Sequence, residues 1–204
     1  MLMDVTSIFK PAGEDLRLLI VHSTEDELGQ NIANGLTSNL NNGINITEKR
    51  VSTLGCLAQM DRPENGFHVV LLIAHGDKAT NQAWLFGDVD INENDIGTNA
   101  AILKAGLNGL INESLCLFGI CYFGQDLLEA AAIIGQGEGE ALGYIAPNGN
   151  STISNIDIQT GFAALLNELQ TRKCDVSIDD LNRILDDKLS DDLRQKLVVV
   201  TAAT

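Results

Sequence analysis

The chain has little positive charge and lacks any long uncharged apolar run. Among its 204 residues, 13 are lysine or arginine and 28 are aspartate or glutamate, so the formal net charge is −15. A surface this acidic repels phosphate backbones and anionic lipids, and we therefore expect no nucleic acid and no membrane partner. The most apolar long window, 115–134, contains Gln125, Asp126 and Glu129, which excludes it as a membrane span.

The amino-terminal residues also lack the features of an export signal. Residues 1–6 carry neither the basic start nor the long apolar core of a signal peptide. The cysteines have no metal-type spacing, and no histidine pair lies close to any of Cys56, Cys116, Cys121 and Cys174. We therefore expect a cytoplasmic protein with reduced thiols, no metal and no cofactor.

Length and composition are those of one soluble globular domain. The chain is 45% hydrophobic and 20% charged, and a chain of this length can bury a sizeable core. No internal repeat, low-complexity segment or linker divides it, so a single domain over 1–204 is expected. Residues 1–15 contain Pro11 and Gly13 without any periodicity, and we expect them to form a loose arm.

Apolar runs and helical patterns alternate along the rest of the chain. Strands are predicted over 17–22, 44–52, 69–74, 115–121, 141–146 and 197–200. Helices are predicted over 24–40, 100–111, 126–134, 158–169 and 178–185. Thr24 with Glu27 has the spacing of a capping box, and Ser177 precedes the last predicted helix. This order predicts an α/β fold with three αβα layers around a mostly parallel, six-stranded sheet.

Two of the predicted strands end on a reactive side chain beside a glycine. His75 and Gly76 follow the strand over 69–74, and Cys121 closes the strand over 115–121, with Gly124 close behind. A buried strand holds its last residue rigidly at the carboxyl edge of a sheet, where ligands of open α/β folds bind. Because a thiol and an imidazole form a nucleophile with its proton-transfer partner, we predict these roles for Cys121 and His75.

The other histidines and the nearest cysteine fit these roles less well. His22 also ends a predicted strand and is the rival base, but no glycine follows it. His68 begins its strand and is therefore expected at the opposite edge of the sheet. Cys116 lies in the middle of its strand, where its side chain should pack into the sheet.

The order of strand, His75-Gly76, strand and Cys121 resembles the caspase-like cysteine peptidases, which include caspases, metacaspases, legumains and bacterial CHAT-type peptidases. Caspases carry the histidine about 50 residues before the cysteine, and here the separation is 46 positions. The pattern over 17–146 is most similar to CHAT-type and metacaspase-like members, with 84–86 resembling a small hairpin strand. The resemblance implies a prokaryotic cysteine endopeptidase that acts on protein or peptide substrates and has a regulatory protein partner.

The resemblance also implies further site residues. The backbone N–H groups of Gly76 and Cys121 would bind the oxyanion of the tetrahedral intermediate. Glu25 or Asp26 would hold a basic P1 side chain of the substrate, because a carboxylate pairs with a guanidinium. Their alternative role is to stabilise the amino-terminal end of the predicted helix.

Phe123 departs from the family pattern and would contact the substrate. Caspases have glycine at this position, and the other families usually have serine within Cys-x-Ser-Gly, which Gly124 completes here. Two alternatives therefore stay open. One is a catalytically silent, caspase-like module that binds proteins. The other is a flavodoxin-like small-molecule binder, although 23–26 is acidic and lacks the glycines of a phosphate loop.

Overall fold

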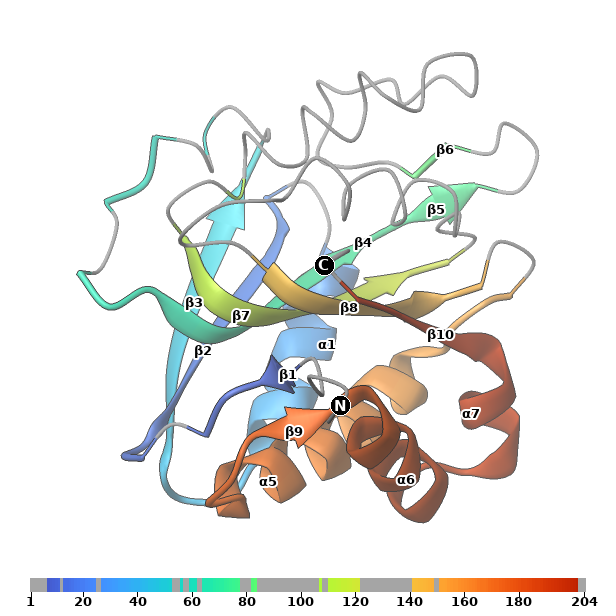
Figure 1. Cartoon of the computed structure of the whole chain (residues 1–204). Helices are drawn as coiled ribbons and strands as arrows, with labels where there is room; N and C mark the ends of the chain where they lie inside the picture. The colour runs from blue at the N-terminus through green and yellow to red at the C-terminus, as the bar shows by residue number, and fades with distance from the viewer. Residues whose placement is uncertain are drawn as a thin grey trace.

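A six-stranded sheet forms the centre of the molecule. The computed structural model describes residues 7–11, 13–24, 27–52, 56, 59–61, 64–77, 82–83, 107, 110–121, 141–148 and 151–201. The strands of the sheet are β2 (Leu16–Ser23), β3 (Ile44–Val51), β4 (Phe67–Ala74), β7 (Ile111–Ile120), β8 (Ala141–Pro147) and β10 (Leu197–Thr201). Their spatial order is β10-β8-β7-β4-β2-β3 (Figure 1).

Five of these strands are parallel, and only β10 runs antiparallel to its neighbour β8. The central strands are continuous apolar runs because both faces of a parallel sheet are buried. All six predicted strands are therefore present. β7 begins earlier than predicted, at Ile111, because a bulge beside Glu113 (φ 54°) interrupts the apolar pattern there.

Helices cover one face of the sheet. They are α1 (Glu27–Ser38), the π-helix η2 (Asp157–Phe162), α5 (Ala163–Thr171), α6 (Ile178–Lys188) and α7 (Asp191–Lys196). Figure 1 shows α1, α5, α6 and α7 on the same side of the sheet. The side chains that fill this helix-side core alternate along the strands, for example Leu18 and Ile20 in β2 and Leu71 and Ile73 in β4.

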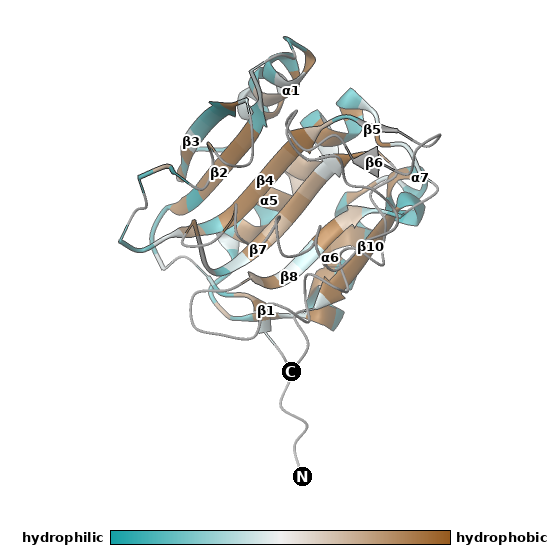
Figure 2. Cartoon of the chain, turned by 90° about the horizontal axis from the view of Figure 1, so that it is seen from above, coloured by the Kyte–Doolittle hydropathy of each residue, from teal (hydrophilic) through white to brown (hydrophobic). Residues whose placement is uncertain are grey.

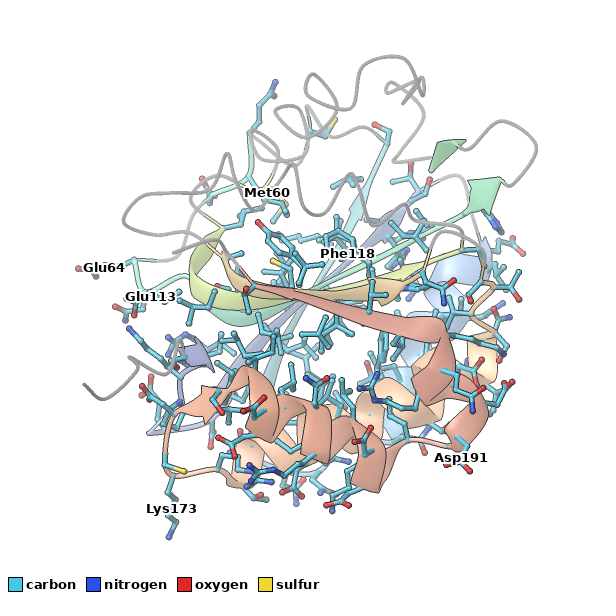
Figure 3. The ribbon with its side chains drawn as sticks, turned by 45° about the vertical axis from the view of Figure 1, so that its right-hand side comes forward. Met60, Glu64, Glu113, Phe118, Lys173 and Asp191 are labelled. Carbon is cyan, nitrogen blue, oxygen red and sulfur yellow. The ribbon has the colours of Figure 1, made fainter. Side chains whose placement is uncertain are left out.

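The opposite face of the sheet is also apolar and buried. Its core contains Val70, Leu72, Cys116 and Phe118 (Figure 3), and Phe118 stacks on Tyr144 with ring centroids 6.2 Å apart. Figure 2 shows how apolar residues dominate the central strands. The prediction of a mixed α/β fold around a mostly parallel, six-stranded sheet is thus confirmed, and the burial of both faces is consistent with three layers. Except for Leu107, Leu110 and Ile111, the predicted helices over 100–111 and 126–134 lie outside the described residues, and Ile111 begins β7 rather than ending a helix.

Two of the short elements that were not predicted from the sequence bury side chains in the helix-side core. Residues 7–9, which were expected in a loose arm, form β1 (Ser7–Phe9), which pairs antiparallel with β9 (Val176–Ser177). Ile8 and Phe9 are buried in the helix-side core. The other element is α7, a six-residue helix with one buried apolar side chain, which is too short to show a helical period.

Of the two predicted helix starts, the structure shows a capping box at Ser177, whereas Thr24 has a different hydrogen-bond partner. Ser177 and Asp180 form a reciprocal capping box at the start of α6, where Ser177 was predicted. The backbone N–H of Thr24, which a capping box would direct to Glu27, donates to the Val51 carbonyl at 3.0 Å. In the described part of the chain, α1 begins at Glu27. None of the helices described is long and apolar enough to cross a membrane.

Candidate functional site

The two predicted reactive residues leave neighbouring strands at the same edge of the sheet. β4 and β7 are adjacent and parallel, and their register continues up to the last pair, Ala74 with Ile120. His75 and Cys121 are the next residue of each strand. Since neighbouring strands lie about 4.8 Å apart, the structure brings these two chain positions together at the carboxyl edge.

The side chain of Cys121 lies on the helix side of the sheet. Ile73 and Gly119 are register partners, and Ile73 belongs to the helix-side core. Cys121 comes two residues after Gly119, so the alternation returns to the same face. The partly buried side chain of Cys121 packs against that core, as the alternation requires.

The thiol of Cys121 contacts a segment that follows β8. Its Sγ donates a hydrogen bond to the carbonyl oxygen of Ile153, with a separation of 3.5 Å. Ile153 is buried in the helix-side core. A second contact lies two residues earlier in β7, because a Cβ added to Gly119 would lie 2.8 Å from Cδ1 of Ile158. Glycine at 119 therefore allows Ile158 to lie directly on the end of β7.

The chain turns back on itself directly after His75. Residues Gly76–Asp77 (β5) pair antiparallel with Gln82–Ala83 (β6), and Figure 1 shows this small hairpin beyond the end of β4. His75 is exposed at this edge of the sheet. The hairpin strand suggested by the sequence at 84–86 follows β6 directly but lies outside the described residues.

Cys116 differs from Cys121 in both position and reactivity. It lies on the opposite face of β7, in the core that contains Phe118. Complete burial raises the pKa of the Cys116 thiol to about 12. Since the thiolate is the reactive form, Cys116 is inert near neutral pH.

His22, the rival base, has no access to a substrate. Its ring is fully buried at the end of β2, and its Nε2 lies 2.9 Å from a carboxylate oxygen of Glu48. Gln30 donates to the same oxygen at 2.7 Å. Partial burial alone would raise the pKa of the Glu48 carboxyl, but the hydrogen bonds from His22 and Gln30 and the charge of Arg50 hold this pKa below its usual value. The histidine therefore joins β2, β3 and α1.

His68 lies near the amino-terminal end of β4, at the opposite edge from His75. Its Nδ1 accepts a hydrogen bond from the backbone N–H of Arg17 at 3.0 Å. Burial and the neighbouring Arg17 guanidinium both lower the pKa of His68, although Glu14 partly opposes them. The ring is therefore neutral near pH 7 and too distant from Cys121 to serve it.

Some of the predicted site residues cannot be placed. Glu25, Asp26 and Phe123 lie outside the described residues, and for Gly76 only the backbone is described. Conversely, Ile153 and Ile158 contact the end of β7 and were not predicted, because nothing in a sequence links positions 119 and 121 to positions more than 30 residues later. Among the residues that the structure describes, no three His, Cys, Asp or Glu side chains are grouped so that they could hold a metal ion.

Comparison of the sequence with protein families and with curated proteins found no match. No protein-family model matches the chain, and no curated protein matches it significantly.

Proposed function

We propose that the protein is a caspase-like cysteine endopeptidase in which Cys121 is the nucleophile and His75 the general acid and base. The observation that carries the proposal is the register of β4 and β7, which ends at Ala74 and Ile120. A thiol and an imidazole that follow paired residues of adjacent parallel strands are close enough to share one substrate. Access supports the same assignment, because Cys121 is half-buried and His75 exposed, whereas Cys116 and His22 are fully buried.

The chemistry proceeds through an acyl-enzyme. The thiol proton passes to His75, and Sγ of Cys121 forms a bond to the carbonyl carbon of the scissile peptide. The negative charge moves to the carbonyl oxygen, which accepts hydrogen bonds from the backbone N–H groups of Gly76 and Cys121. The carbon–nitrogen bond then breaks, and His75 gives its proton to the leaving amine. A water molecule gives a proton to His75 and attacks the acyl carbon, and the carbon–sulfur bond breaks.

The sheet supports a caspase-like fold without being specific to it. In chain order, the strands of the sheet are arranged 2-1-3-4-5 with a sixth, antiparallel strand at the edge. The six-stranded, mostly parallel sheet is what the resemblance implies, although flavodoxin-like proteins share the order 2-1-3-4-5. Those proteins bind phosphate in the loop after their first strand. Here that strand end is closed, since His22 is buried against Glu48 and Thr24 is bonded to Val51.

The proposed substrates are proteins or peptides in a prokaryotic cytoplasm. A basic P1 side chain would pair with Glu25 or Asp26, which follow β2 in the sequence. Phe123 leaves one alternative, a catalytically silent module of the same fold that binds a regulatory protein partner.

A peptide library read by mass spectrometry tests the proposal. Wild type and Cys116→Ala should cleave the same peptides, because Cys116 is buried on the other face of β7. Cys121→Ala should cleave none, and His75→Ala should be slower by about 10²–10⁴-fold. Cleavage by Cys121→Ala would contradict the assignment of the nucleophile. A wild type that cleaves nothing would favour the silent module, and a preference for neutral P1 residues would exclude the role of Glu25 and Asp26.

A further inference from the structure

The segment 151–158 lies across the end of β7 and makes both contacts described there. We call this segment the strap. The carbonyl of Ile153 accepts the hydrogen bond from Sγ of Cys121 at 3.5 Å. Cδ1 of Ile158 occupies the space next to Gly119 that a side chain at 119 would need. One element thus contacts the backbone that carries Cys121 and also the thiol itself.

Hydrogen bonds hold the strap at both of its ends. At its start, the backbone N–H of Ser151 donates to the Asn148 carbonyl at 2.9 Å. The backbone N–H of Asn148 donates in turn to the Lys196 carbonyl at 2.7 Å. Near its end, two reciprocal hydrogen bonds join Ser154 and Asp157. The backbone N–H of Ser154 donates to the Asp157 carboxylate at 2.9 Å, and the backbone N–H of Asp157 donates to the Ser154 hydroxyl oxygen at 3.2 Å. The strap is therefore fixed through Asn148 to the last residue of α7, and through Asp157 to the start of η2.

The π-helix η2 connects the strap to α1. Ile158 is its second residue, and the next residue, Gln159, donates from its side chain to the Asn31 carbonyl at 3.2 Å. The side chain of Gln159 also fills the space that a Cβ at Gly35 would need. π-helical turns are rare and are often found at functional sites. Here the wider turn places Ile158 on Gly119 while Gln159 contacts α1.

We propose that the strap is a positioning element for the nucleophile, an inference that rests on the proposed role of Cys121. Ile158 holds the end of β7 at Gly119, and the Ile153 carbonyl fixes the orientation of the thiol. The strap also helps to bury the thiol, which is partly buried. Displacement of the strap therefore makes Cys121 more accessible to a small reagent but less well placed for a bound peptide.

A pair of complementary substitutions tests this role. Gly119→Ala adds a methyl group that would lie 2.8 Å from Cδ1 of Ile158, so the Ile158 side chain must move away from the end of β7. Ile158→Val lacks that Cδ1 atom and makes room for the new methyl group. We expect Gly119→Ala to raise the rate of iodoacetamide alkylation at Cys121 roughly threefold or more, because displacement of the strap uncovers the partly buried thiol. Ile158→Val in the Gly119→Ala background should return the rate to about the wild-type value.

Site-resolved mass spectrometry separates this effect from general loosening of the fold. Cys116, in the same strand and fully buried, reports unfolding and should stay unmodified in every variant. Ile184→Val, which removes the same methyl group from a buried α6 side chain in the same core, is the matched control and should leave the rate at Cys121 unchanged. Alkylation of Cys116 together with Cys121 would instead indicate global opening and would overturn the proposal.

Peptide cleavage provides the second readout. Gly119→Ala should lower kcat by about tenfold or more with little change in KM, since small displacements of a reacting group cost up to about 10²-fold. The double variant should recover kcat. An unchanged alkylation rate in Gly119→Ala, or a double variant that does not recover, would overturn the role of the strap. Because alkylation needs no peptidase activity, a wild type that cleaves no peptide would refute the proposed function and still leave the strap testable.

Discussion

Replacing Glu48 by glutamine should destabilise the protein in a pH-dependent manner. The carboxylate of Glu48 receives hydrogen bonds from the fully buried His22 at 2.9 Å and from Gln30 at 2.7 Å. Removing one partner of a buried ion pair costs about 3–5 kcal/mol, and an exposed pair contributes about 0–1 kcal/mol. The Glu48 side chain is 31% exposed, and glutamine keeps its shape and one acceptor oxygen. We therefore expect a loss of about 1–2 kcal/mol at pH 7.

The sign of the pH dependence follows from the lowered pKa of the Glu48 carboxyl. The unfolded chain binds a proton at this group more readily than the folded protein does, so folding is favoured as the pH rises. The contribution is complete above the unfolded pKa of about 4.3 and is lost as the pH falls through the lower, folded value. Glu48→Gln cannot titrate, so the difference from wild type should be largest at neutral pH and shrink at acidic pH.

Urea unfolding from pH 7 down to the acid limit of the folded state measures both effects. In a separate thermal melt at pH 7, the variant should lose about 2–8 °C in Tm, given about 2–4 °C per kcal/mol for a chain of this size. Gln30→Ala is a useful comparison, because it removes one donor to Glu48 and leaves the hydrogen bond between His22 and Glu48 intact. A stability difference that stays constant over the pH range would refute the lowered pKa of the Glu48 carboxyl. A difference below about 0.3 kcal/mol at pH 7 would show that the pair is solvated as at a surface.

The remaining predictions concern the core and the helix cap. Phe9→Ala should lower the free energy of unfolding, measured by urea titration, by about 3–5 kcal/mol, because Phe9 is buried in the helix-side core. A change below about 1 kcal/mol would mean that β1 does not pack against this core in solution. Ser177→Ala should cost about 1 kcal/mol, since Ser177 caps α6, whereas Ser177→Asp should retain most of the stability. Cys116 should react with a thiol reagent in the native protein far more slowly than Cys56 and Cys174, both of which are exposed; equal rates would contradict the burial of Cys116.

The central strands could be predicted because burial of both faces gives a parallel strand a continuous apolar run. The runs that end at Ser23, Ala74 and Ile120 carry this signal, and the positions of His75 and Cys121 follow from where the runs stop. The edge strand β3 was predicted from weaker alternation, in keeping with the charged residues that it carries.

Other features depend on contacts between distant parts of the chain, which a local pattern does not encode. β1 is only three residues long and exists because it pairs with β9, more than 160 residues later. The contacts of Ile153 and Ile158 with the end of β7 depend on how β8 returns to the helix side. The burial of His22 similarly requires a carboxylate from β3 and a glycine from α1. Each of these features is set by tertiary packing rather than by propensity.

Covalent labelling with an electrophilic peptide, such as a peptidyl acyloxymethyl ketone with a basic P1 residue, tests the central claim most directly. The wild-type protein should gain one peptide adduct on Cys121, identified by mass spectrometry of the digested protein. Cys121→Ala should gain none, and His75→Ala should be labelled at least about 100-fold more slowly, because the proton-transfer partner is missing. Labelling at Cys56 or Cys174 with Cys121 unmodified, or equal rates in wild type and His75→Ala, would contradict the assignment of His75 and Cys121 as a catalytic pair.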